Sequence, residues 1–182
     1  MKKKSITKYE IRRANPDEYE NLGRMTVEAY EQLPGMPGAA EQPEYYAMLY
    51  DVASRASKPT IEIFVAVTAE NELLGGVTFI GDAKHYNAGG TASTNVDSSG
   101  IRLLAVKPEA RGLGVGKSLT KACIQRAMEI RTSQVILHTT KSMDIAWRMY
   151  EGMGFLRSPD LDFHQEELSV YGFRFKLPVN TK

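Results

Sequence analysis

The sequence lacks the features that mark secreted and membrane-spanning proteins. Its 182 residues include a single cysteine, Cys123, so no internal disulfide can form and a reducing compartment is expected. The opening Met1-Lys2-Lys3-Lys4 is followed by polar residues and not by the apolar core of a secretory signal. No apolar run approaches the roughly 20 residues that span a bilayer. We therefore expect a cytoplasmic protein with no membrane partner.

Excess charge and metal-ligand clusters are also missing. A net charge of +1 gives no electrostatic reason to expect nucleic acid as a partner. The histidines His85, His138 and His164 are scattered without ligand spacing, so no metal site is expected. His138 stands in an apolar strand pattern, which favours a structural role. With ordinary apolar and charged fractions, 42% and 25%, residues 1–182 are expected to form one domain, flexible over residues 1–8.

The most informative segment is rich in glycine. ARGLGVGKSL, Ala110 to Leu119, lies between an apolar strand pattern at Ile101–Val106 and a helical pattern that begins near Gly114. Glycines let backbone N–H groups approach a ligand closely, and a helix N-terminus adds partial positive charge. The segment therefore predicts an anion-binding turn.

Two nucleotide-binding loops are excluded by counting. The P-loop G-x-x-x-x-G-K-[ST] would need a glycine where Arg111 stands. The dinucleotide pattern G-x-G-x-x-G would need its third glycine at Lys117 or at Leu119. A nucleotide hydrolase is therefore disfavoured.

The pattern that does fit is R-x-x-G-x-G, with Arg111, Gly114 and Gly116. It resembles the coenzyme A pyrophosphate loop of the GNAT superfamily of N-acetyltransferases. Upstream, IRLLAVKPEARG resembles the central strand of that family. Downstream, AWRMYEGMGF resembles its A-x-x-x-Y-x-x-x-G-F helix and turn, with Tyr150 at the tyrosine position. The resemblance is specific over roughly residues 100–158.

The residue patterns predict the elements, and the resemblance implies their arrangement. We expect an α/β (α+β) fold with a mixed, mostly antiparallel central sheet of six to seven strands flanked by about four helices. The first helix starts at Asn15, and Ser142 caps the fourth. Residues 81–100 are expected to form a long mobile loop. The predicted strands are 9–12, 61–67, 73–80, 101–106, 134–139 and 169–177, and the predicted helices include 43–56.

By resemblance, acetyl-CoA is the cosubstrate. Its pyrophosphate would lie on the N–H groups from Gly112 to Lys117, with charge from Arg111 and Lys117, and its pantetheine arm would run along a strand edge. The residues implied are Leu104, Ala105, Val106, Arg111, Gly112, Leu113, Gly114, Val115, Gly116, Lys117 and Ser118. The competing interpretation is that the glycines merely close a turn.

The resemblance makes Tyr150 the proton donor to the departing thiolate. A phenol with a pKa of about 10 is a suitable donor to a thiolate of about 8.5. A buried aromatic of a helix is the competing interpretation. The general base is left undetermined among Glu28, Glu31, Glu62, Asp82 and Asp97.

Some residues depart from the family pattern or have two interpretations. Met143 stands where many members carry an Asn that helps to fix the coenzyme A arm, and Thr139, Thr140 or Ser142 are candidate substitutes. Four tyrosines in the substrate-facing segments either line a pocket or simply pack: Tyr30, Tyr45, Tyr46 and Tyr86.

The sequence thus predicts an acetyl-CoA-dependent N-acetyltransferase. A primary amine of a small molecule or peptide would attack the thioester directly, because Cys123, on the core face of a helix, is a poor nucleophile. The alternative is a non-catalytic acyl-CoA-binding or sensing module on the same fold. The sequence leaves open whether the protein forms a homodimer and whether it transfers acyl groups other than acetyl.

Overall fold

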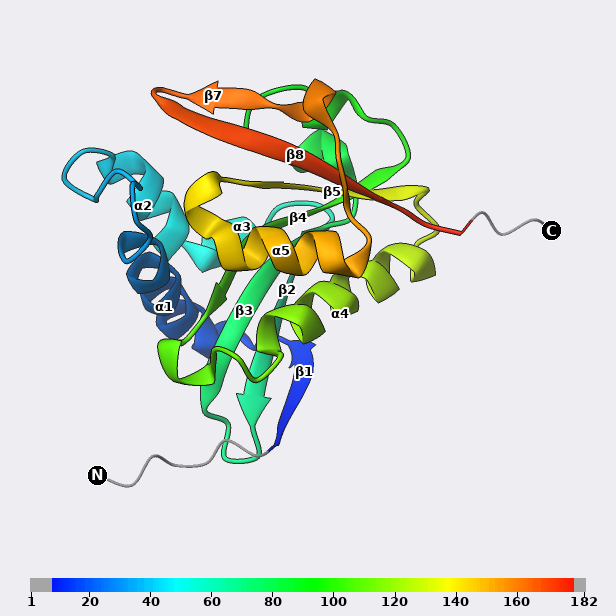
Figure 1. Ribbon diagram of the computed structural model, residues 1–182. Helices are drawn as coiled ribbons and strands as arrows, with labels where there is room; N and C mark the ends of the chain where they lie inside the picture. Colours follow the sequence, from blue (N-terminus) through cyan, green and yellow to red (C-terminus); the bar gives the residue numbers. More distant parts are fainter. Residues whose placement is uncertain (1–7, 179–182) are drawn as a thin grey trace.

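The computed structural model describes residues 8–178, so the flexibility expected for residues 1–8 lies almost wholly outside the described residues. These residues form an eight-stranded sheet in the order β1-β2-β3-β4-β5-β8-β6, with β7 paired to β8 (Figure 1). All paired neighbours are antiparallel except β4 and β5. The strands are β1 Tyr9–Arg13, β2 Ile61–Thr68, β3 Leu73–Ile80, β4 Ser98–Val106, β5 Gln134–Thr139, β6 Leu156–Arg157, β7 Phe163–Gln165 and β8 Leu168–Lys176.

Helices cover both faces of this sheet. In Figure 1, α4 and α5 cross in front of the strands, and α1 and α2 lie together at one side. The helices are α1 Tyr19–Glu31, α2 Pro43–Tyr50, α3 Val52–Ala56, α4 Val115–Glu129 and α5 Asp144–Met153. None of the helices described is both long and apolar enough to cross a bilayer.

Strand β2 shows why two layers of helices are needed. It is apolar along nearly its whole length, and successive side chains of a strand point to opposite faces. Phe64 and Ala66 pack in one cluster with residues of α4 and α5, whereas Val65 and Val67 pack in another with residues of α1 and α3. Both faces of β2 are therefore buried, as the continuous apolar run indicates.

The predicted fold class is confirmed, with two differences in the count of elements. Strands β6 and β7 contain only two and three residues, too few to show an alternating pattern. The helix expected over residues 43–56 is two helices, α2 and α3, because the backbone of Asp51 leaves the helical conformation (φ −80°, ψ 71°). The Asp51 carboxylate then accepts a hydrogen bond from the Ser54 N–H at 3.0 Å and caps α3.

Of the two helix starts predicted from local sequence, one is confirmed and the other is wrong. The predicted start at Asn15 is confirmed: a 3-10 turn at Pro16–Glu18 leads into α1, and the Asn15 N–H donates to Glu18 Oε2 at 2.7 Å. The predicted cap at Ser142 is wrong. Its hydroxyl lies 2.8 Å from Thr140 Oγ1 inside another 3-10 turn, and α5 begins after Met143 without a side-chain cap.

The segment expected as a loop over residues 81–100 ends earlier, because β4 already begins at Ser98. It holds two 3-10 turns, Ala83–His85 and Ala92–Thr94. Tyr86, between these turns, is 2% exposed and packs against Ile136 of β5. The segment therefore covers the sheet, and its mobility stays a prediction.

The crossing of α1 and α2 depends on a close contact that only glycine permits. A Cβ added to Gly23 would lie 2.1 Å from the Tyr50 carbonyl oxygen. We expect Gly23→Ala to lower the free energy of unfolding by about 1–3 kcal/mol, because overpacking outweighs the gain in helix propensity. Gly152→Ala in α5, where nothing lies within 4 Å, is the control and should raise it by about 0.5–1 kcal/mol. Urea denaturation of both variants measures the difference, and a Gly23→Ala variant as stable as wild type would contradict the packing described.

Candidate active site

The centre of the site is the point where β4 and β5 separate. The two strands pair in parallel only from Ser98 and Gln134 to Ile101 and Leu137. Beyond Ile101, β4 continues to Val106 beside β3 alone, and β5 continues to Thr139 beside β8 alone. One edge of residues 102–106 therefore has no strand partner. Unpaired backbone N–H and C=O groups at such an edge can bind an extended ligand.

A β-bulge accompanies this separation. Gly76 pairs with Ala105 and Thr78 pairs with Arg102, so Val77 of β3 faces two residues of β4. One of these, Leu103, has φ +56°, a left-handed conformation that costs a non-glycine residue of order 1–3 kcal/mol. Bulges bend the strand that carries them and are common beside active sites. Leu103 is a plain leucine in an apolar run, so no pattern in the sequence indicated it.

The glycine-rich turn between β4 and α4 has the conformation that an anion site requires. Gly112 and Gly114 have φ of +78° and +80°, which glycine adopts without a steric penalty. The first bond of α4 runs from the Ser118 N–H to the Gly114 carbonyl at 2.9 Å. The N–H groups of Val115, Gly116 and Lys117 therefore precede the hydrogen-bond ladder of the helix and remain available to a ligand.

The turn lies next to the unpaired edge of β4. A Cβ at Gly116 would lie 3.5–3.7 Å from Met149 Sδ, Leu104 Cδ2 and Val106 Cγ2. The start of α4, the end of β4 and the middle of α5 thus meet at one place. Arg111 and Lys117 are exposed at the turn.

Tyr9 of β1 is hydrogen-bonded to this turn, and no pattern in the sequence indicated that contact. Its hydroxyl lies 2.9 Å from Ser118 Oγ and donates to the Leu113 carbonyl at 3.3 Å. Tyr9 and Ser118 are 109 residues apart in the chain. No spacing rule connects residues so distant, so only the folded sheet reveals the contact.

Tyr150 is buried in the core that α4, α5 and the sheet share. It is 5% exposed, and its ring makes a T-shaped contact with Phe155 at 5.6 Å between centroids. Burial raises the pKa of its phenol well above the ordinary value, with smaller contributions from Cys123 and Tyr86. Its hydroxyl has no hydrogen-bond partner in the described part of the chain, so it can donate to a ligand.

A pocket opens where β4 and β5 part. Three of the four tyrosines in question line it, Tyr30, Tyr45 and Tyr86, whereas Tyr46 is buried elsewhere and donates to the Pro37 carbonyl. Tyr150 is not among the lining residues and lies in the core cluster that α4, α5 and the sheet share. The remaining lining residues are Met36, Ala88, Ile101, Arg102, Leu103, His138, Thr139, Thr140, Met143, Phe163, Gln165, Leu168 and Val170.

His138 is held by both of its ring nitrogens. Nε2 lies 2.7 Å from the Leu161 carbonyl, to which it must donate, and Nδ1 lies 3.0 Å from the Tyr86 hydroxyl, whose proton it can accept. Burial lowers the pKa of His138, so the neutral ring is favoured near pH 7. These bonds agree with the structural role predicted for it.

None of the carboxylates considered as a general base lines the pocket. Glu28 and Glu31 are exposed on α1. Glu62 forms ion pairs with Arg13 and Arg126. Asp82 accepts a bond from the Lys84 N–H at the start of a 3-10 turn, and Asp97 lies in the turn before β4. The carboxylates that the sequence offered therefore lie outside the pocket lining.

Met143, at the position where many family members carry Asn, and the three candidate substitutes for that Asn have different surroundings. Met143 lines the pocket, and the hydroxyls of Thr140 and Ser142 bond to each other. Thr139 also lines the pocket, and its buried Oγ1 has no hydrogen-bond partner within residues 8–178. Of these three candidate substitutes, Thr139 is the one whose hydroxyl has no partner in the described residues.

The thiol of Cys123 takes no part in this arrangement. Cys123 is fully buried on α4, and burial raises the pKa of its thiol, so the thiolate is disfavoured at neutral pH. Among residues 8–178, no three His, Cys, Asp or Glu side chains gather in a group that could hold a metal ion.

The sequence of this chain is similar to sequences of known acetyltransferases. The profile of the Acetyltransferase (GNAT) family matches residues 24–155. Mycothiol acetyltransferase of Paenarthrobacter aurescens (strain TC1) is 33% identical over 93 residues, which are 51% of this chain and 27% of that protein. N-alpha-acetyltransferase 30 of Saccharomyces cerevisiae is 35% identical over 57 residues, 31% of this chain and 32% of that protein. The matches thus span less than two thirds of either relative.

A solved structure shows the same fold at low identity. The PaiA N-acetyltransferase of Thermoplasma acidophilum, in complex with coenzyme A, superposes with a TM-score of 0.71. The two are 16% identical, and the alignment covers 94% of this chain and 100% of that one.

The buried tyrosines around the pocket predict a pH-dependent stability. Burial raises the pKa of Tyr45 to about 12, so the unfolded chain releases this proton near pH 10 while the folded protein keeps it. Stability conferred by the protonated phenol is complete below about pH 10 and is lost as the pH rises toward 12, by about 1.4 kcal/mol per pH unit. Tyr45→Phe should therefore flatten the fall in unfolding free energy between these pH values, measured by denaturant titration. The exposed Tyr50→Phe is the control, and equal slopes in the two variants would contradict the expectation.

Proposed function

Since the chain belongs to the GNAT acetyltransferase family, we propose that it transfers an acetyl group from acetyl-CoA to a primary amine of a small molecule or peptide. The observation that carries the proposal is the meeting of the glycine-rich turn, the unpaired edge of β4 and helix α5 around Gly116. The relatives are named for mycothiol and for an N-alpha group, so their names leave the kind of acceptor open.

The chain's own residues fit coenzyme A. The N–H groups at the start of α4 suit a pyrophosphate, and Arg111 and Lys117 add positive charge at the exposed turn. The backbone of Leu104, Ala105 and Val106 offers donors and acceptors to the amides of a pantetheine arm. Acetyl-CoA, when bound, supplies the thioester whose carbonyl carbon is attacked.

The reaction needs three actions from the protein. The pocket orients the acceptor, whose neutral nitrogen forms a bond to the carbonyl carbon while the carbon–sulfur bond breaks. The nitrogen releases its extra proton to water, because no carboxylate among residues 8–178 lines the pocket. Tyr150 donates its proton to the departing sulfur and regains one from water, and its raised pKa keeps the phenol protonated across the neutral range. The products are an amide and the free thiol. We place this activity in the cytoplasm.

Coenzyme A binding is tested first, with paired lysine variants of α4. Lys117→Ala removes a charge at the turn and should weaken the Kd for coenzyme A about tenfold, a loss of about 1.4 kcal/mol. Lys121→Ala removes the same charge one turn further along α4, where it is also exposed, and should leave the Kd unchanged. Calorimetric titration measures both. Equal Kd values for the two variants, or no binding by the wild type, would exclude the proposed pyrophosphate site.

Tyr150 is tested by removing one oxygen atom. Tyr150→Phe keeps the ring packing and should lower kcat about 100-fold with an unchanged Kd for coenzyme A, because proton donation contributes about 10²–10⁴ to such rates. Thiol release during acetylation of an amine panel gives kcat, and the exposed Tyr50→Phe serves as the control. An unaltered kcat would remove Tyr150 from the mechanism. Coenzyme A binding without turnover of any amine would favour the acyl-CoA-binding module instead.

A further inference from the structure

The pocket beside the separated strands holds a guanidinium that no carboxylate balances. Arg102 of β4 lines the pocket and is half-buried. Its Nη1 donates to the carbonyl oxygens of Tyr86 and Asn87, both at 3.1 Å. Over residues 8–178, its Nε and Nη2 have no hydrogen-bond acceptor, and no Asp or Glu oxygen lies within ion-pair distance of it. The Nε–Nη2 edge therefore keeps two parallel N–H donors free, the arrangement that matches the two oxygens of a carboxylate.

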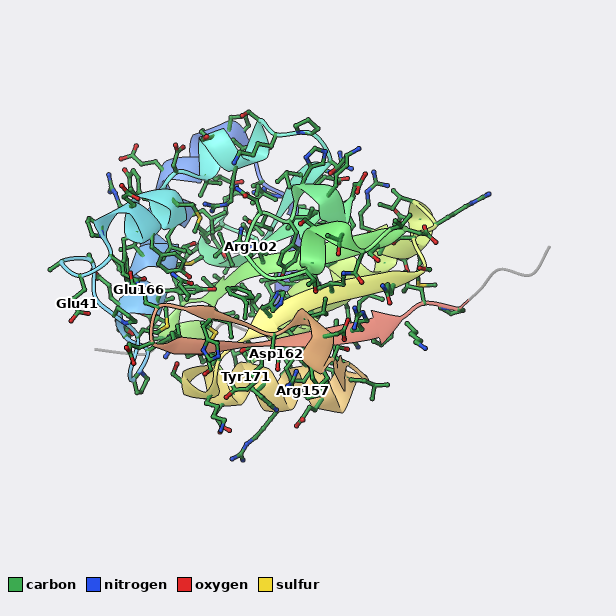
Figure 2. All side chains as sticks on the ribbon, turned by 90° about the horizontal axis from the view of Figure 1, so that it is seen from above. Glu41, Arg102, Arg157, Asp162, Glu166 and Tyr171 are labelled. Carbon is green, nitrogen blue, oxygen red and sulfur yellow. The ribbon has the colours of Figure 1, made fainter. Side chains whose placement is uncertain are left out.

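Arg102 carries the formal charge of the pocket. Within residues 8–178 the lining includes no aspartate or glutamate, and burial favours the neutral form of His138. In Figure 2, Arg102 lies near the middle of the molecule, whereas Glu41 and Glu166 lie at one edge. Both glutamates already accept hydrogen bonds, Glu41 from the Gly38 N–H and Glu166 from Gln42 Nε2.

A second arginine strengthens this imbalance. Arg55 of α3 is 9% exposed and donates to the carbonyl oxygens of Met48 and Leu49, but its buried Nε has no partner in the described residues. The pKa of Arg55 is lowered to about 10, first by burial and then by the like charge of Arg102. The like charges of Arg55 and Arg102 repel each other, so an anion bound beside Arg102 would be favourable.

The other walls of the pocket indicate what accompanies the anion. Aromatic and aliphatic side chains form most of the lining, including Tyr30, Phe163 and Leu168. Thr139 also lines the pocket, and its buried Oγ1 has no hydrogen-bond partner within residues 8–178. A ligand that suits these walls has an apolar skeleton and few polar groups.

We propose that the acceptor is a small amine that carries a carboxylate on an apolar skeleton, and that Arg102 binds this carboxylate through Nε and Nη2 and so determines specificity. This inference rests on the proposed acetyl transfer, because it names the acceptor of that reaction. It disfavours polyamines, whose additional ammonium groups would lie beside a guanidinium with no carboxylate to balance them.

Matched sets of acceptors measure the effect of the carboxylate separately from the effect of the rest of the acceptor. One set is phenylalanine, phenylalaninamide and phenethylamine, and a second is γ-aminobutyrate, γ-aminobutyramide and butylamine, which places amine and carboxylate further apart. Spermidine is the polycation. In the better of the two sets we expect the wild type to favour the carboxylate by about 10- to 100-fold in kcat/KM, the effect of a charged hydrogen-bonded pair.

The variants assign that preference to Arg102. Arg102→Gln should reduce the ratio of carboxylate to amide to about threefold or less, and Arg102→Lys should keep part of it, because a lysine retains the charge but not the fork. Arg148→Gln, which removes the same charge from an exposed position on α5, should keep the full ratio. Arg102 also holds the segment before β4, so melting temperatures accompany the kinetics. An Arg102→Gln variant that melts earlier but keeps the ratio would show a purely structural residue and overturn the inference.

The remaining outcomes distinguish the inference from the proposed function. Preference for uncharged amines or for spermidine, unaffected by Arg102→Gln, would overturn the inference and leave acetyl transfer intact. Binding of coenzyme A without turnover of any amine would refute the proposed function. In that case, the thermal shift of the coenzyme A-saturated protein with the same acceptors tests whether Arg102 forms an anion site. A shift with the carboxylates alone that Arg102→Gln abolishes supports the anion site, and no shift with any acceptor overturns it.

Discussion

The separation of β4 from β5 is the constraint on which the site depends. Pairing ends at Ile101 and Leu137, and the bulge at Leu103 bends β4 away while it still pairs with β3. Strain at Leu103 persists because β3 and the helices on both faces hold the strand on either side of it. The same separation leaves a backbone edge unpaired and opens the pocket between the strands. The edge proposed for the cofactor and the pocket proposed for the acceptor are thus two consequences of one break in the sheet.

The chemistry of that gap follows from which groups are absent as well as from which are present. In the described chain the pocket holds aromatic rings, a neutral histidine with both nitrogens engaged and an arginine without an acidic partner. In the proposed reaction, a carboxylate of the pocket therefore does not remove the proton from the amine. The same lack of acidic residues is the basis for proposing an anionic group on the acceptor, so one feature bears on both mechanism and specificity.

The sequence predicted what is encoded locally. A glycine that adopts positive φ, a helix start and an apolar strand depend on neighbouring residues, so the turn at Gly112–Gly114, the start at Asn15 and the strand β2 were all predictable. Predictions went wrong where one local hydrogen bond takes the place of the expected one. The Ser142 hydroxyl bonds to Thr140 and caps no helix, and the Asp51 carboxylate caps α3, which divides the expected second helix. Strands as short as β6 have no periodicity to detect and exist because β8 pairs with them.

The sequence by itself therefore determined the family, the fold class and the glycine-rich turn, because their signals lie within short stretches of chain. Only the tertiary structure decided which residues share the gap. Tyr9 reaches Ser118, and Arg102 meets the segment of Tyr86, across separations that no local pattern records. It also placed the candidate carboxylates outside the pocket. Which charges face one another depends on how strands pair and diverge, and that is set by the packing of the whole sheet.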